Sequence, residues 1–267
     1  MDTSKPSTRS ENTVEKTSTL FGDPTADISF VSSDGVTFKI HSKYLGAVSE
    51  GFGAPESTVI DSKPIALAEA AEVLEVLFQF VHPPFEFHQS HQPSVKDMEI
   101  NLFFAVATAA EKYVVYGIMN MCVTRMRYEL YESHPVEVLN HAANHGYDDL
   151  ADIAAAETIS LPNPLEETLA GLTDPKVAVR WTKYYGHWLQ ILKFTNNLLQ
   201  NTNNKNCLGL FNLIGDLLRH LTVNPTNIKM PAWRSACGSA LCDCQQGKWG
   251  EIIKAEVEAI PKFTEVT

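Results

Sequence analysis

The residues with the most reactive side chains in this sequence are histidines and cysteines, and one group of them could hold a metal. Cys237, Cys242 and Cys244 place three thiols close together, with Cys207 or His220 as a candidate fourth ligand. A structural zinc site takes four such ligands, but its thiols usually come as Cys-x-x-Cys pairs, which is not the spacing here. We therefore expect buried cysteines that behave as small hydrophobic residues, with structural zinc as the alternative.

A second pair, His141 and His145, lies four residues apart on a predicted helix, which can bring two imidazoles to one metal. In zinc proteases with this spacing a glutamate general base directly follows the first histidine, and here that residue is Ala142. The pattern therefore indicates two partly exposed helix histidines, and a metal site is the alternative.

Other catalytic arrangements are not found. The acidic residues Asp148, Asp149 and Asp152 could do acid/base work only in a cleft, whereas the start of a helix already explains them through the helix dipole. The sequence contains no Gly-x-Ser-x-Gly elbow, no Gly-x-x-x-x-Gly-Lys loop and no Gly-x-Gly-x-x-Gly turn. We predict no catalytic residue, no cofactor site and no enzymatic activity.

Composition and charge exclude several partners. The chain has 267 residues with 21 basic against 32 acidic side chains, a net charge of -11, and no segment concentrates Lys and Arg. A basic footprint for direct nucleic-acid binding is therefore absent. The longest apolar run, from Ile100 to Ala110, is too short to cross the ~30 Å hydrocarbon core of a bilayer, so we expect no membrane insertion.

Location follows from the beginning of the chain and from its cysteines. Residues 1–20 lack the apolar centre of a signal peptide and are predicted to be a disordered tail. Five cysteines, an odd number without secretory targeting, fit a reducing compartment and free thiols. We expect the protein in the cytoplasm or the nucleus.

The elements that carry these residues differ between the two halves of the chain. Apolar residues alternate from Ile28 to Phe30 and from Val36 to Ile40 around an Asp34-Gly35 turn, which predicts a hairpin with one buried face. Leu45, Val48 and Phe52 follow at helical spacing. Residues 59–60 are a candidate strand. Residues 66–82 are predicted to form an amphipathic helix ended by Pro83-Pro84, with apolar side chains at helical intervals from Val73 to Val81.

The remaining segments are predicted to be helical. Two packed helices are expected between Val95 and Met126, with a break near Gly117. Gly146 is expected to cap the end of one helix. Asn163-Pro164 and Asp174-Pro175 are expected to start two others, and the Glu166 carboxylate is expected to accept hydrogen bonds from backbone amides at the start near Asn163. An Asn-rich loop over 196–206, an apolar helix over 207–221 and a closing helix over 249–260 complete the chain. Trp181, Tyr184, Tyr185 and Trp188 form an aromatic band that we expect in the core.

From Ala26 to Arg127 the chain resembles a BTB/POZ domain. The resemblance lies in Asp27, the Ser33-Asp34-Gly35 turn, Phe38 to His41, and Ser49 to Phe52. It continues in the Ile-x-Leu of residues 65–67, in Ala110 to Tyr113, and in the helix that bears Cys122. It implies an α+β fold with a small sheet flanked by helices over 21–127, followed by a helical extension over 128–267 like those of fungal members. His41 is then a hydrogen-bonded structural residue.

The resemblance also implies a function. A BTB domain forms a homodimer, so we expect a non-catalytic interaction module that acts as an adaptor or scaffold, with a cullin-type ubiquitin ligase as one candidate partner. The family's hydrophobic-x-Glu docking signal reads Ala54-Pro55-Glu56 here. The alternative is a metal-binding or enzymatic protein that uses the cysteine cluster or His141 and His145. The expected interface residues are Leu20, Phe21, Leu45, Val48, Phe52 and Glu56, and the segment around Leu20 could extend the partner's sheet.

Overall fold

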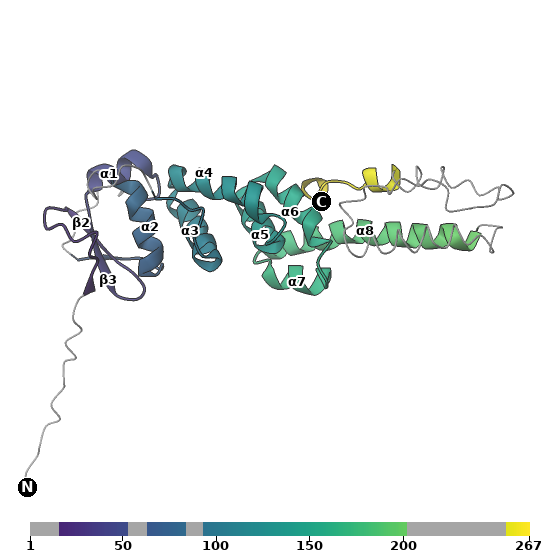
Figure 1. The fold of residues 1–267 in the computed structure, drawn as a ribbon, viewed down its shortest axis with the longest axis horizontal. Helices are drawn as coiled ribbons and strands as arrows, with labels where there is room; N and C mark the ends of the chain where they lie inside the picture. The colour runs from purple at the N-terminus through teal and green to yellow at the C-terminus, as the bar shows by residue number, and fades with distance from the viewer. Residues whose placement is uncertain (1–15, 53–62, 84–92, 202–254) are drawn as a thin grey trace, which may run out of the picture. The chain divides into compact units, whose positions relative to one another are not determined.

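The chain forms two compact units, the first ending at Arg125 and the second beginning at Met126. A computed structural model describes residues 16–52, 63–83, 93–201 and 255–267 (Figure 1). The predicted strand at 59–60, the helix over 207–221 and the cysteine cluster lie outside these residues. Within them, no helix combines the length and the apolar character needed to cross a membrane.

A small mixed sheet forms the first unit together with helices, in agreement with the predicted α+β class. Its strand order is β1-β3-β2-β4. Strands β2 (Ile28–Val31) and β3 (Val36–Ile40) are antiparallel, with Phe30 opposite Phe38, and Gly35 takes a φ of 82° in the turn between them. The predicted hairpin is confirmed. Strands β1 (Lys16–Thr17) and β4 (Ile65–Ala66) add in parallel at the two edges.

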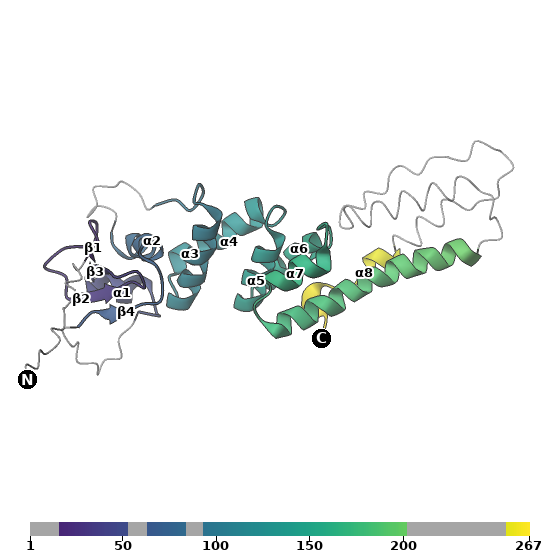
Figure 2. The same ribbon diagram turned by 90° about the horizontal axis from the view of Figure 1, so that it is seen from below.

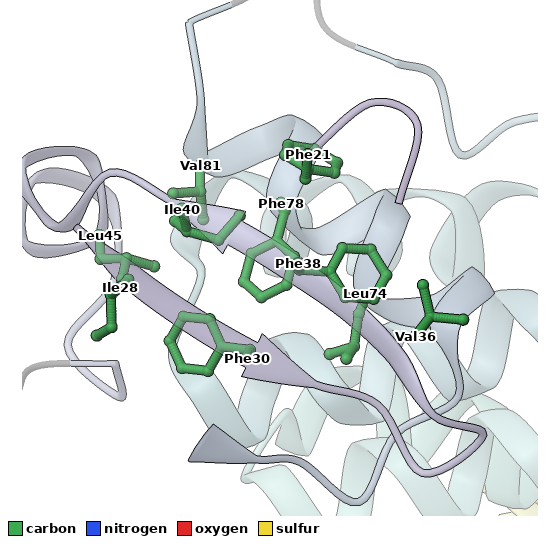
Figure 3. Close-up of a cluster of buried hydrophobic side chains, with 10 residues drawn as sticks. All are labelled: Phe21, Ile28, Phe30, Val36, Phe38, Ile40, Leu45, Leu74, Phe78 and Val81. Carbon is green, nitrogen blue, oxygen red and sulfur yellow. The ribbon is translucent and has the colours of Figure 1, made fainter. Parts of the chain in front are cut away.

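The core of the first unit lies between one face of this sheet and a helix. Alternation along β2 and β3 turns every second side chain to the same face, where it packs against α2 (Ala71–Val81). Figure 3 shows these side chains meeting, with Phe78 beside Phe38. Helix α1 (Ser42–Val48) contributes Leu45 to the same cluster. The buried members are Phe21, Ile28, Phe30, Val36, Phe38, Ile40, Leu45, Leu74, Phe78 and Val81.

Two further helices, α3 (Ile100–Tyr113) and α4 (Tyr116–Arg125), complete the first unit, but their boundaries differ from the prediction. The first begins at Ile100 rather than near Val95, with the Glu99 side chain accepting a hydrogen bond from the Leu102 amide. The break lies at Val114, which has left-handed backbone angles of φ 52° and ψ 54°, and not at Gly117, which is inside α4. Local propensity favours glycine in that conformation, so the break is imposed by the neighbouring structure, where Val115 bridges to Ser49.

The second unit is helical throughout its described residues. It begins with the π-helical turn η2 (Met126–Leu130) and contains α5 (Pro135–His145), α6 (Asp148–Thr158), α7 (Pro164–Gly171), α8 (Pro175–Asn201) and the short η3 (Phe263–Glu265). The predicted starts at Pro164 and Pro175 are confirmed, and Gly146 ends α5 with a φ of 77°.

Two details of these helices were predicted wrongly. The carboxylate that reaches back to the Asn163 amide belongs to Glu167, at 3.0 Å, and not to Glu166. Helix α8 also runs on to Asn201, through the first part of the predicted Asn-rich loop. Each asparagine costs a helix only about 0.5 kcal/mol relative to alanine, which is too little to stop a helix that is already growing.

Candidate interaction surface

Two aspartates of the first unit each cap a helix from a distant point in the sequence. The Asp27 carboxylate accepts hydrogen bonds from the amide and the hydroxyl of Ser42, at the start of α1. The Asp34 carboxylate accepts the amide of Ala71, at the start of α2, at 2.9 Å. The hydrogen bonds from Ser42 lower the pKa of Asp27. The hairpin therefore fixes where both helices begin.

Tyr113, at the end of α3, joins the end of α1 to the rest of the first unit. Its main-chain oxygen accepts hydrogen bonds from the Ser49 hydroxyl and from the Gly51 amide. Its ring stacks on Phe52 with centroids 4.2 Å apart. Its hydroxyl donates to Glu69 at 2.5 Å, and the ammonium of Lys112 lies 2.7 Å from the same carboxylate. Partial burial raises the pKa of Glu69, but the hydrogen bonds from Lys112 and Tyr113 outweigh it, so the net shift is downward.

The apolar residues expected at an interface lie mostly in the core of a single chain. Phe21 is 2 % exposed and Leu45 is 3 % exposed, and both pack among the side chains of the sheet and α2. A partner that binds the chain in this state would not contact these two side chains. Apolar periodicity identifies the buried face of an element, but it does not say whether the same chain or a second copy covers that face.

The other expected interface residues are placed differently from one another. Val48 and Phe52 are partly buried against the core, although α1 already ends at Val48. Leu20 is 41 % exposed. The segment before it forms β1, which pairs with β3 of the same chain. Glu56 lies outside the described residues.

The side of α1 that faces away from the core carries small residues between charged ones. Gly46 and Ala47 are exposed there, with Lys43 one turn earlier and Glu50 two residues beyond the end of the helix, and we call these four residues the α1 face. A Cβ added to Gly46 would have no heavy atom within 4 Å. Such a face allows the backbone of another element to approach closely. These four residues were not identified from the sequence as part of an interface, although a glycine inside a helical segment can indicate close approach of another backbone.

His41 lies among aromatic rings, as expected for a structural residue. Its Nε2 is 3.5 Å from the Asp23 carboxylate. Its ring lies 5.9 Å from that of Tyr44 and 5.8 Å from that of His82, measured between centroids. These contacts join the start of α1 to the end of α2.

The two histidines of α5 are close together, but the prediction that both are partly exposed is wrong for His141. Their ring centroids are 4.7 Å apart, and His141 is 5 % exposed while His145 is on the surface. Burial, and to a smaller degree the neighbouring His145, lowers the pKa of His141 to about 4. Over the residues that the structure describes, no group of three or more His, Cys, Asp or Glu side chains is arranged to hold a metal ion.

The acidic residues of α6 have structural partners. Asp149 forms an ion pair with Arg127 at 2.7 Å, and Asp152 accepts two hydrogen bonds from Thr264. Asp148 begins the helix, as predicted.

Three residues of the aromatic band and the first cysteine are buried, whereas the fourth member of the band, Tyr185, is only partly buried. Trp181, Tyr184 and Trp188 belong to the core of the second unit, and the indole of Trp181 donates to Thr158 at 2.8 Å. Cys122, in α4, is a free thiol, and burial raises its pKa to about 12. The other four cysteines lie outside the described residues.

No protein-family model matches the sequence, and no curated protein matches it either.

Proposed function

We propose that residues 21–127 form a BTB/POZ-like domain that pairs with a second copy, and that the protein is a non-catalytic interaction module of the cytoplasm or nucleus. The helices of the second unit would then hold or shape the site for another protein partner. A cullin-type ubiquitin ligase scaffold is one such partner, and Glu56 would contact it.

One observation carries the proposal. The resemblance rests on a small set of residues in the first unit. In four contacts, these residues bind either one another or the start of a helix of the same unit. Asp27 and Asp34 cap the two helices, and Ser49 and Phe52 both contact Tyr113. Residues spread over 87 positions are thus held together by direct contacts within one small unit. The strands and helices of this unit follow one another in the order that the resemblance implies.

The α1 face is the surface that we assign to the second copy. Gly46 and Ala47 leave room for the same helix of another chain, and a two-fold interface brings each patch against itself. Lys43 of one chain would then approach Glu50 of the other. A specific dimer needs about 1,600 Å² of total buried area, so the exposed Leu20 and β1, which is an edge strand among the described residues, would add to the α1 face.

Light scattering on a sizing column, with the protein at tens of micromolar, tests the pairing. We expect twice the chain mass of 29.6 kDa for the wild type, and a monomer for Gly46→Arg. The arginine has open space within its own chain and improves helix propensity, so it should not unfold the domain.

Gly186→Arg is the matched control, because Gly186 is also a helical glycine with nothing within 4 Å of an added Cβ, but in α8. It should leave the dimer intact. A wild-type monomer, or a Gly46→Arg variant that still dimerises, would contradict the proposal.

A further inference from the structure

A short segment of the second unit lies on two helices that come much earlier in the sequence. Residues 202–262 separate η3 (Phe263–Glu265) from the end of α8, yet η3 packs on α6 and α8 (Figure 2). Phe263 is 1 % exposed, with its ring edge-on to Tyr184 and the guanidinium of Arg180 5.6 Å from its centroid. Val266, three residues on, is buried as well.

Polar contacts fix the same segment in register. The Thr264 amide donates to the Asp152 carboxylate at 2.9 Å, and the Thr264 hydroxyl lies 2.9 and 3.1 Å from its two oxygens. The Lys183 ammonium donates to the main-chain oxygen of Thr267 at 2.6 Å. A hydroxyl on a carboxylate, between two apolar anchors, is a contact pattern that discriminates among peptide sequences.

The segment satisfies much of its backbone by itself. The amide of Glu265 donates to the oxygen of Lys262, the amide of Val266 donates to the oxygen of Phe263, and the Glu265 carboxylate accepts the Lys262 amide. Its contacts with α6 and α8 are therefore those of a small folded peptide on a surface, made through a few side chains, the Thr264 amide and the Thr267 main-chain oxygen.

We propose that Asp152, Arg180, Lys183 and Tyr184, which we call the α6–α8 face, form a peptide-docking site. Its resident ligand is the Phe-Thr-Glu-Val of residues 263–266, and it accepts in exchange another polypeptide segment with an aromatic residue, a threonine and an aliphatic residue in the same order. The proposal does not rest on dimerisation of the first unit.

The small size of the contact allows exchange. Two buried side chains and a few hydrogen bonds give a free peptide a Kd of about 10–100 μM. A chain of the length of residues 202–262 holds the resident segment at an effective concentration on the order of 1 mM. The site is then mostly occupied by its own chain, and a partner segment at high local concentration displaces it.

A fluorescein-labelled peptide of residues 258–267 tests the proposal by fluorescence polarisation on the full-length chain. We expect the Phe263→Ala/Val266→Ala double variant, whose own segment is weakened, to bind the peptide at least ten-fold more tightly than the wild type does. Adding Asp152→Ala should lower that affinity at least ten-fold. Adding Asp148→Ala, which removes the same charge from the exposed start of the same helix, should change it less than two-fold.

Hydrogen exchange of the wild type keeps the test decisive if the double variant fails to fold. The amides of Thr264, Glu265 and Val266 should exchange at least 100-fold faster than those in the middle of α6, because the segment leaves its site without unfolding the helices. Equal protection of the two sets, or a folded double variant that does not bind the peptide, would overturn the proposal and make the segment a permanent part of the core.

Discussion

His141 is a histidine kept neutral in the folded chain. Burial in the second unit disfavours its charged form, and its pKa falls from 6.5 to about 4. In the unfolded chain the same imidazole takes up a proton near pH 6.5. Protonation therefore favours unfolding, so the contribution of His141 to stability is complete above pH 6.5 and is lost as the pH falls toward 4.

Lowering the pH from 7 to 5 should reduce the free energy of unfolding of the second unit by about 1–2 kcal/mol through this residue. His141→Phe keeps a ring of similar size and should remove that part of the pH dependence. Urea titrations followed by tryptophan fluorescence at the two pH values measure it. His187→Phe, the same substitution in α8, is the control and should retain the full difference. A His141→Phe chain that loses as much stability as the wild type would show that other groups are responsible.

At the scale of elements, the approach of α1 to α3 depends on the absence of a side chain. A Cβ on Gly51 would lie 2.5 Å from the Cα of Tyr113, closer than such atoms come, and the obstacle is backbone that cannot turn aside. Five residues earlier, a Cβ on Gly46 meets nothing.

The two glycines should therefore respond to alanine in opposite directions. We expect Gly51→Ala to destabilise the first unit by about 2–3 kcal/mol, because the end of α1 must move away from Tyr113. Gly46→Ala should stabilise it by about 0.5–1 kcal/mol, through helix propensity. Thermal unfolding followed by far-UV circular dichroism compares them, and a neutral Gly51→Ala would show that the α1 end is not held against α3.

Val114 carries backbone strain between α3 and α4. A β-branched residue in the left-handed region costs about 1–2 kcal/mol, and glycine is the usual residue at this capping position. Val114→Gly should raise the stability of the first unit by about 0.5–1 kcal/mol after the extra entropy of the unfolded glycine is counted. The same denaturation experiment applies. Val123→Gly, inside α4, should instead lower stability by a similar amount.

How much of these elements could be predicted depends on whether the signal is local. The Asp34-Gly35 turn, the cap at Gly146 and the starts at Pro164 and Pro175 are fixed by residues whose backbone preferences act at their own positions, and all four were predicted. Val114 adopts a left-handed backbone conformation that valine disfavours, so the contacts around it, and not its own residue type, determine the break between α3 and α4.

For the candidate surface the limit is similar. Helical spacing identified Leu45 as a residue to be buried, and Phe21 was expected at the interface, but the sheet and α2 that cover both belong to the same chain. The exposed Gly46 and Ala47 have little hydrophobicity and no reactive group. Their position opposite the core side of α1 distinguishes them, and that requires the packed structure.

At the scale of the whole molecule, the two units can be observed separately. All four tryptophans, at positions 181, 188, 233 and 249, come after Met126 in the sequence, and the two described ones, Trp181 and Trp188, are buried in the second unit, so their fluorescence reports on that unit. If each unit unfolds by itself, Gly51→Ala should shift an early part of the circular dichroism transition and leave the fluorescence midpoint within experimental error of the wild type. Coincident shifts in both signals would mean that the chain unfolds as one cooperative body.

The burial of Cys122 has a practical consequence for thiol chemistry. With a pKa of about 12 and almost no accessible surface, its sulfur should not react with maleimide at neutral pH while the chain is folded. Every maleimide label counted by mass spectrometry on the native protein would then belong to the four cysteines between positions 202 and 254. A loss of three or four labels after zinc is added would show that the cluster of Cys237, Cys242 and Cys244 binds the metal.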